Sequence, residues 1–335
     1  MTFADVSSIE PRSPVRQPAL RLSAGRVGGW RHCAYGVLAW LSLSVPAVQA
    51  DFEAGMNAFQ EQRYASAIHE WRDPAERGDP EAQFALGRMY EQGLGVRENL
   101  EEAGKWFRLA AESGNTFAQV RLGQLYLAGR LEGKPEDAIQ WLSQAAEAGD
   151  DVAQFQLGLL YLEGSGVSVD EREAARWLEV AAEQGHTGAQ NNIGSLYEAG
   201  RGVVQSDTRA IEWYEKAALQ GDSLAQNNLG AMHARGRGTE RNHAWAVFWF
   251  AMSAQAGNQQ ARDNLETSLE HLEARAIAGS RVNIRAAAGT DSQILTTMDR
   301  GEDVKELGSV DGWSQIYLEV EGTPTLGWVS SNLLD

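Results

Sequence analysis

The feature that most constrains the fold of this chain is a repeat of about 36 residues. An Ala-Gln pair recurs five times, at steps of 36, 35, 36 and 36 residues, with a weaker sixth start at Ala261. The five starts are Ala82, Ala118, Ala153, Ala189 and Ala225. A tryptophan follows each start by 23 or 24 residues, at Trp106, Trp141, Trp177, Trp213 and Trp249, and Trp71 precedes the series. A fixed period of this length indicates units that stack on their neighbours.

Each unit is predicted to be a helix–turn–helix. Ala82, Leu86 and Tyr90 are spaced four apart and share one helix face, and the segment 93–95, with two glycines, ends that helix. A second helix follows, with apolar residues at helical spacing that include Ala103, Trp106, Phe107, Ala110 and Ala111. Because a lone unit cannot bury both apolar faces, the units must stack into an all-α, right-handed α/α solenoid with the tryptophans in its core.

The strings Ala189–Tyr197 and Gly200–Val203, followed by Ala210, Trp213 and Gly221, resemble the Sel1-like repeat, a relative of the tetratricopeptide repeat. The resemblance implies five repeats plus a terminal helix over 82–278, with the helix at 259–277, and a diverged leading repeat over 51–81. Two units depart from the pattern. The second is one residue short, so we expect its turn to differ, and the fifth has His233 where tyrosine is usual.

After Ala278 the pattern changes to short alternating runs separated by glycines, at 281–285, 302–307, 314–320 and 327–330. This pattern predicts a small all-β barrel, so the chain is multidomain. Residues 279–335 resemble a bacterial SH3 domain (SH3b), which implies peptidoglycan or peptide ligands and makes Trp313, Tyr317 and Trp328 candidate ligand residues. The alternative is a stabilising cap whose tryptophans serve the barrel core and rim. Because its core is small, we expect the barrel to dock on the last solenoid helix.

The N-terminal segment has the layout of a secretory signal peptide. Five arginines precede an uncharged stretch from Cys33 to Ala50, which ends in a small-residue cleavage pattern before Asp51. The alternative is a membrane anchor, for which 18 uncharged residues broken by Gly36 and Pro46 are marginal. We expect a signal peptide over 1–50, cleavage after Ala50, no integral membrane span in the mature chain, and a periplasmic or secreted protein.

Composition narrows the function further. The only cysteine, Cys33, lies in the segment expected to be removed, so disulfides, thiolate catalysis and cysteine zinc sites are excluded. The formal charge of −17 becomes −20 after cleavage, with 24 basic and 44 acidic residues. Such a chain should avoid nucleic acid and anionic membrane surfaces.

A search for catalytic patterns identifies no nucleophile elbow, no metal-binding histidine helix and no glycine-rich phosphate loop. The remaining histidines fall in different repeats without a shared ligand spacing: His69, His186, His233, His243 and His271. We therefore expect no enzyme activity, no cofactor and no metal site.

A binding site is predicted in the C-terminal half of the solenoid. Asn192, Asn228 and Asn264 occupy the position at which tetratricopeptide relatives clamp a ligand backbone, and Trp245 and Phe248 belong to a nearby aromatic cluster. The alternative is that these asparagines bond a neighbouring helix or face water.

The leading functional hypothesis is an exported, non-catalytic scaffold of the bacterial cell envelope. Its solenoid would hold a protein or peptide partner, and its barrel would contact peptidoglycan or a second protein. Two alternatives stay open: an activator or regulator of a cell-wall enzyme, and a secreted effector that binds a host protein.

Overall fold

The structure, a computed structural model, describes residues 46–335, so the predicted signal segment falls almost entirely outside the described residues. These residues form thirteen α-helices and six strands. The helices are α2 (Pro46–Gln60), α3 (Tyr64–Glu76), α4 (Pro80–Gln92), α5 (Leu100–Glu112), α6 (Thr116–Leu127), α7 (Pro135–Glu147), α8 (Asp151–Glu163), α9 (Glu171–Glu183), α10 (Thr187–Ala199), α11 (Asp207–Leu219), α12 (Ser223–Arg235), α13 (His243–Gln255) and α14 (Gln259–Leu269).

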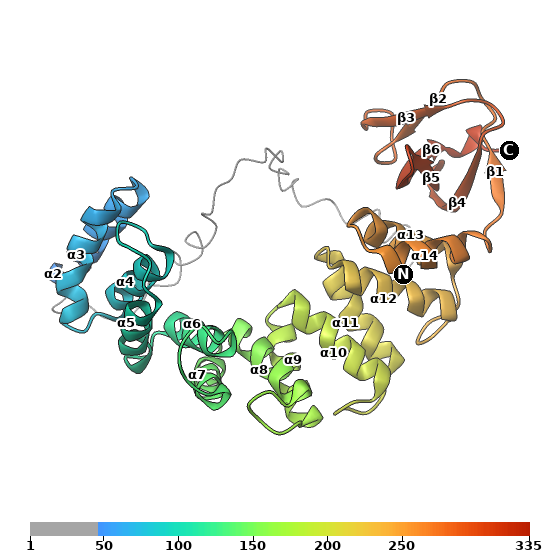
Figure 1. Ribbon diagram of the computed structural model, residues 1–335. Coiled ribbons are helices and arrows are strands. Elements are labelled where there is room, and N and C mark those ends of the chain that lie inside the picture. Colours follow the sequence, from blue (N-terminus) through green and yellow to red (C-terminus); the bar gives the residue numbers. More distant parts are fainter. Residues whose placement is uncertain (1–45) are drawn as a thin grey trace.

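The helices confirm the helix–turn–helix prediction for every unit. The five units are the pairs α4–α5, α6–α7, α8–α9, α10–α11 and α12–α13, with α2–α3 before them and the single helix α14 after them. The pairs follow one another along a curved array, and the strands lie beyond its C-terminal end (Figure 1).

Local sequence fixes where the helices begin and end. Asp79, Asn99 and Asp150, for example, each accept a hydrogen bond from a backbone N–H in the first turn of the helix that they cap. Four first helices end on a glycine in the left-handed conformation, namely Gly93, Gly164, Gly200 and Gly236. In the short second unit Gly129 is also left-handed, but Leu131 replaces the second left-handed glycine found at Gly95, Gly166, Gly202 and Gly238, so the expected difference in that turn is confirmed.

The tryptophan stripe is less deeply buried than we predicted. Trp71, Trp177, Trp213 and Trp249 are buried, whereas Trp106 and Trp141 are only half-buried. The residue after each of the five repeat tryptophans is buried in every unit: Phe107, Leu142, Leu178, Tyr214 and Phe250. Each packs on the glycine of its own first helix, where an added Cβ would lie within 3 Å of the side chain. The glycine therefore sets the close approach of the two helices in a unit.

A repeated hydrogen bond joins consecutive units. The side-chain amide of Gln83 donates through Nε2 to the backbone carbonyl of Ala75, near the end of α3, at 3.0 Å. The same bond joins Gln119 to Ala111, Gln154 to Ala146, Gln190 to Ala182 and Gln226 to Ala218, at 3.0 or 3.1 Å. All five glutamines are buried, and each bond is the second that its acceptor carbonyl receives, since the N–H of the glycine after each helix also donates to that carbonyl.

The side-chain oxygens of these glutamines have a hydrogen-bond donor at some junctions between units but not at others. Gln184 and Gln220, the C-cap residues of α9 and α11, donate at 2.7 Å to the side-chain oxygens of Gln154 and Gln190. The side-chain oxygen of Gln226 is buried with no hydrogen-bond partner, and Ala256 is the C-cap residue of α13, 30 residues further on.

We expect Ala256→Gln to stabilise the protein by about 1 kcal/mol, because its amide can reach the unsatisfied oxygen of Gln226, as the amides of Gln220 and Gln184 reach the equivalent oxygens one and two repeats earlier. Urea unfolding measures the change. Ala256→Met is the matched control, since it has a similar length and no N–H donor. Equal stability of the two variants would contradict the prediction.

The strands form one antiparallel sheet in the order β1-β4-β5-β6-β2-β3. Their bounds are β1 (Ala274–Ala276), β2 (Val282–Arg285), β3 (Ile294–Met298), β4 (Asp303–Val310), β5 (Trp313–Val320) and β6 (Thr323–Ser330). The predicted SH3-like barrel is confirmed, and its core includes Ile284, Ile316 and Val329.

Two boundaries differ from the prediction. The terminal helix, expected over 259–277, ends at Leu269, and residues 274–276 pair with β4 as strand β1. The sheet therefore begins before the predicted start at 279. Strand β1 has only three residues, too few to show an alternating pattern in the sequence.

The barrel packs against the end of the solenoid, as expected from its small core. Leu307 and Tyr317 share one apolar cluster with Val247 and Phe250 of α13 and with Leu265 of α14. Two side-chain to backbone bonds cross or flank this contact: Gln255 Nε2 donates to the Pro324 carbonyl at 2.8 Å, and Lys305 Nζ donates to the Leu272 carbonyl at 2.6 Å. Contact is made mainly through α13 rather than through the last helix alone.

Candidate functional site

The predicted asparagines form a ladder between consecutive first helices. Asn228 Nδ2 donates to Asn191 Oδ1 at 3.1 Å, and Asn264 Nδ2 donates to Asn227 Oδ1 at 2.9 Å. Asn192 instead donates to the Gly188 carbonyl of its own helix at 2.8 Å. In the free chain, two of the three amides therefore bond a neighbouring helix, which was one of the alternatives left open.

Sequence reasoning missed Asn191 and Asn227, the acceptors in this ladder. The signal was the Asn-Asn doublet, which occurs at the same place in the fourth and fifth units. The third unit has Phe155 at the position of Asn191, so Asn192 lacks such a partner in the preceding helix. The ladder thus begins at α10 and belongs to the C-terminal half of the solenoid.

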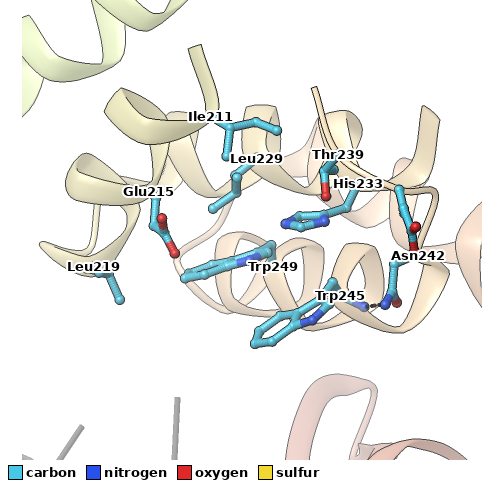
Figure 2. Close-up of a pocket in the computed structure, with 10 residues that line it drawn as sticks. Ile211, Glu215, Leu219, Leu229, His233, Thr239, Asn242, Trp245 and Trp249 are labelled. Carbon is cyan, nitrogen blue, oxygen red and sulfur yellow. Dashed lines mark hydrogen bonds between the residues drawn. The ribbon is translucent and has the colours of Figure 1, made fainter. Parts of the chain in front are cut away.

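A cavity of about 370 Å³ lies between α11, α12 and α13 (Figure 2). Trp245 and Trp249 form one wall, with ring centroids 6.5 Å apart and planes tilted by 20°. Phe248 does not line the cavity; its ring meets both tryptophans edge-on, at 5.5 and 5.0 Å. The remaining lining residues are Ile211, Glu215, Leu219, Leu229, His233, Thr239, Glu240 and Asn242.

The cavity is acidic and aromatic. No lysine or arginine is among its lining residues, whereas Glu215 and Glu240 are. Burial raises the pKa of the Glu215 carboxyl. His233 stacks on Trp245 with ring centroids 6.1 Å apart, its Nδ1 is buried without a hydrogen-bond partner, and burial lowers its pKa to about 4.

The lowered pKa of His233 predicts a loss of stability in mild acid. The unfolded chain takes up a proton near pH 6.5 but the folded chain only near pH 4, so stability falls as the pH falls through this window. We expect His233→Tyr, which restores the residue of the other units, to remove this part of the pH dependence. Urea unfolding of both proteins between pH 7 and pH 4 measures it, because the opposing contribution of Glu215 is common to both. Parallel stability curves would contradict the prediction.

The cavity and the asparagine ladder are separate sites. None of Asn192, Asn228 and Asn264 lines the cavity. The ladder joins α10, α12 and α14, whereas the cavity lies between α11, α12 and α13, so the two sites share only α12. The predicted binding site therefore divides into two surfaces rather than one.

The three candidate ligand residues of the barrel differ in burial and in what they contact. Trp313, Gln315 and Tyr317 lie on the same face of β5, because side chains alternate along a strand. Trp328 of β6 pairs with Gln315, so its side chain lies on that face of the sheet too. Trp313 and Trp328 are half-buried. Tyr317 is 5% exposed and packs in the cluster with α13, and burial raises the pKa of its hydroxyl above the usual range. Tyr317 therefore serves the contact between the domains, which the sequence pattern could not show.

The fold brings together two histidines that are far apart in sequence. His243 and His271 stack with centroids 4.1 Å apart and planes tilted by 3°, and burial, then the neighbouring His271, lowers the pKa of His243. Within residues 46–335, no group of three or more His, Cys, Asp or Glu side chains is arranged to hold a metal ion. The same part of the chain has no helix long and apolar enough to cross a membrane.

Comparison with known families matches both parts of the fold. The Sel1 repeat model matches residues 80–115, 116–150, 151–186, 187–222 and 223–258, and the bacterial SH3 domain model matches residues 280–335. Each matched repeat begins two residues before one of the five Ala-Gln pairs.

Solved structures support the same fold. A Sel1 repeat protein from Oxalobacter formigenes is 33% identical, with a TM-score of 0.58 over 64% of this chain and 86% of that one. A protective antigen present in uropathogenic Escherichia coli strains is 38% identical, with a TM-score of 0.59 over 61% of this chain and 44% of that one.

A curated relative matches over a short stretch. DAP3-binding cell death enhancer 1 from Rattus norvegicus is 48% identical over 52 residues, which are 16% of this chain and 10% of that protein. The mouse protein of the same name is 46% identical over 52 residues. This chain thus spans about a tenth of the length of these curated relatives.

Proposed function

This chain belongs to the Sel1 repeat family and ends in a bacterial SH3 domain, and from this we propose that it is an exported, non-catalytic scaffold of the bacterial cell envelope. Sel1 repeats generally mediate protein interactions. The observation that carries the proposal is the packing of the barrel on α13, because it joins a second potential binding module to the repeat array at a set position.

Export rests on the signal segment at residues 1–50. Cleavage after Ala50 would leave Asp51 as the first residue. The next residue, Phe52, packs against the core of the leading unit. The Phe52 ring contacts that of Trp71 at a tilt of 31°, with centroids 6.1 Å apart, and its carbonyl accepts a 3.2 Å hydrogen bond from Trp71 Nε1. Mass spectrometry of the protein recovered from the periplasm or medium tests the site. A mature chain that begins at Asp51 supports export, and a full-length cytoplasmic chain contradicts it.

The solenoid would hold a protein or peptide partner along the asparagine ladder. Each amide has donor and acceptor capacity beyond the bond that it makes in the free chain, and an extended backbone can use that capacity. Crosslinking in the native cell followed by co-purification identifies the partner. Asn192→Ala with Asn228→Ala should weaken its binding, and Glu183→Ala with Glu212→Ala, exposed on second helices, should not. Unchanged affinity of the asparagine variant would place the partner elsewhere.

The barrel would contact peptidoglycan or a second protein through Trp313 and Trp328. The test uses the whole mature chain, because removal of the solenoid would expose Leu307 and Tyr317. Co-sedimentation with purified peptidoglycan that is lost in Trp313→Ala with Trp328→Ala supports wall binding. Absence of co-sedimentation contradicts wall binding and leaves the second protein as the ligand.

A further inference from the structure

An arginine closes the space between the second helices of the third and fourth units. Arg209 Nη2 lies 2.7 Å from Glu179 Oε1, and its guanidinium carbon lies 4.1 Å from the centroid of the Tyr197 ring. The Tyr197 hydroxyl donates to the same carboxylate oxygen at 3.0 Å. An acid, an aromatic ring and a cation therefore form a complete set at this junction.

The next junction keeps the acid and the aromatic ring but not the cation. Thirty-six residues after Glu179, Tyr197 and Arg209 stand Glu215, His233 and Trp245. All three of these residues line the cavity of about 370 Å³, which contains no lysine or arginine. Among residues 46–335, the ion pairs include Glu179 but not Glu215. Trp245 lies over the His233 ring as Arg209 lies over Tyr197, but it carries no charge, so the half-buried Glu215 carboxylate faces the cavity without the guanidinium that Glu179 has.

A second cation is missing at the same place. Lys216 Nζ lies 3.7 Å from the centroid of the Trp213 ring, whereas the corresponding residue one repeat later, beside Trp249, is Met252. The position of Arg176, whose guanidinium lies 3.9 Å from the Trp177 ring, is occupied by Phe248 in the fifth unit. At the two positions from which cations lie over Trp177 and Trp213, the fifth unit therefore has uncharged residues beside Trp249.

We propose that this cavity binds an arginine side chain of a protein partner, with its guanidinium paired to Glu215 and stacked on the ring of Trp249. The partner would supply from outside the group that Arg209 supplies from within the chain one repeat earlier. The formal charge of −17 favours the approach of a basic segment. This inference rests on the proposed function, because it names the side chain that a protein partner would insert.

The test is a titration of the whole chain with Nα-acetyl-arginine methylamide, followed through the NMR signals of the tryptophan indole N–H groups. The control probe is the citrulline analogue, which has the same shape and no charge. We expect saturable shifts of the Trp249 signal with the arginine probe, and an affinity lower by about tenfold or more in Glu215→Gln. Glu179→Gln is the matched variant, since Arg209 already occupies that site, and it should bind the probe as the unchanged protein does.

Three outcomes would overturn the proposal: equal response to the citrulline probe, equal affinity of Glu215→Gln, or equal loss in Glu179→Gln. A further variant, Trp245→Arg, rebuilds the arrangement of the preceding repeat and should block the probe while keeping the helix content. The probe reads the cavity without any partner, so its result is independent of the scaffold proposal. If a crosslinked partner binds Glu215→Gln as tightly as it binds the unchanged chain, the cavity is not its site and the scaffold proposal still stands.

Discussion

Gly202→Ala is expected to lower the free energy of unfolding by about 3 kcal/mol, because it combines backbone strain with a clash. Gly202 has a φ of 69°, in the left-handed region that favours glycine. A Cβ at this position would lie 1.9 Å from the carbonyl oxygen of Glu171, at the start of α9 in the preceding unit. Because that atom belongs to the backbone of a helix, it cannot move aside as a side chain could.

Gly221→Ala is the matched control. Gly221 also has a positive φ, of 91°, but an added Cβ there would meet nothing within 4 Å. We expect a cost of only about 1 kcal/mol, from backbone strain alone. Urea unfolding measures both costs. Because repeat arrays can open locally, hydrogen exchange of the backbone amides in α9 and α11 should be measured as well. Similar losses in the two variants would show that the close approach at Gly202 contributes nothing.

Phe250→Ala is expected to cost about 3–5 kcal/mol and to release the barrel from the solenoid. Phe250 is 2% exposed, packs on Gly230 of α12, and belongs to the cluster that includes Leu307 and Tyr317 of the barrel. The substitution therefore leaves a void at the junction of two domains as well as within the fifth unit.

Phe107→Ala separates these two effects. Phe107 is the same residue at the same position of the first unit, is fully buried, and packs on Gly87 in the same way. It should lower stability by a similar amount without loosening the barrel. Limited proteolysis in the segment 270–273, between α14 and β1, reports the release. Equal cleavage of the two variants would contradict a role for Phe250 in joining the domains.

The repeat made most of the fold predictable, because each signal occurs five times. The glycine of each first helix, the tryptophan of each second helix and the helix-ending glycines kept the same spacing, and the structure places them at equivalent points in each unit. The short second unit was also predictable, since a missing residue must change the turn in which it is missing.

Contacts between units were harder to predict. The sequence shows Gln190 and Gln220 as ordinary polar residues, and only the stacking of units brings the second onto the first. The cavity beside Glu215 could be recognised only by comparison of two junctions, because what distinguishes it is the replacement of Arg209 by Trp245 in the next unit. Tyr317 was assigned to a ligand face because nothing in the alternating pattern of β5 reveals which part of that face meets α13.

The packing of the barrel on α13 also determines how the two domains could act on ligands at once. A flexible linker would let a second ligand be reached over a range of distances, at a local concentration that falls as the linker lengthens. Here the link between α14 and β1 is only four residues, and apolar side chains hold the barrel in place. Two linked ligands whose separation equals that of the two domains' binding sites would bind one molecule together, and each would strengthen the other's binding. Linked ligands at any other separation could occupy only one of its two sites at a time.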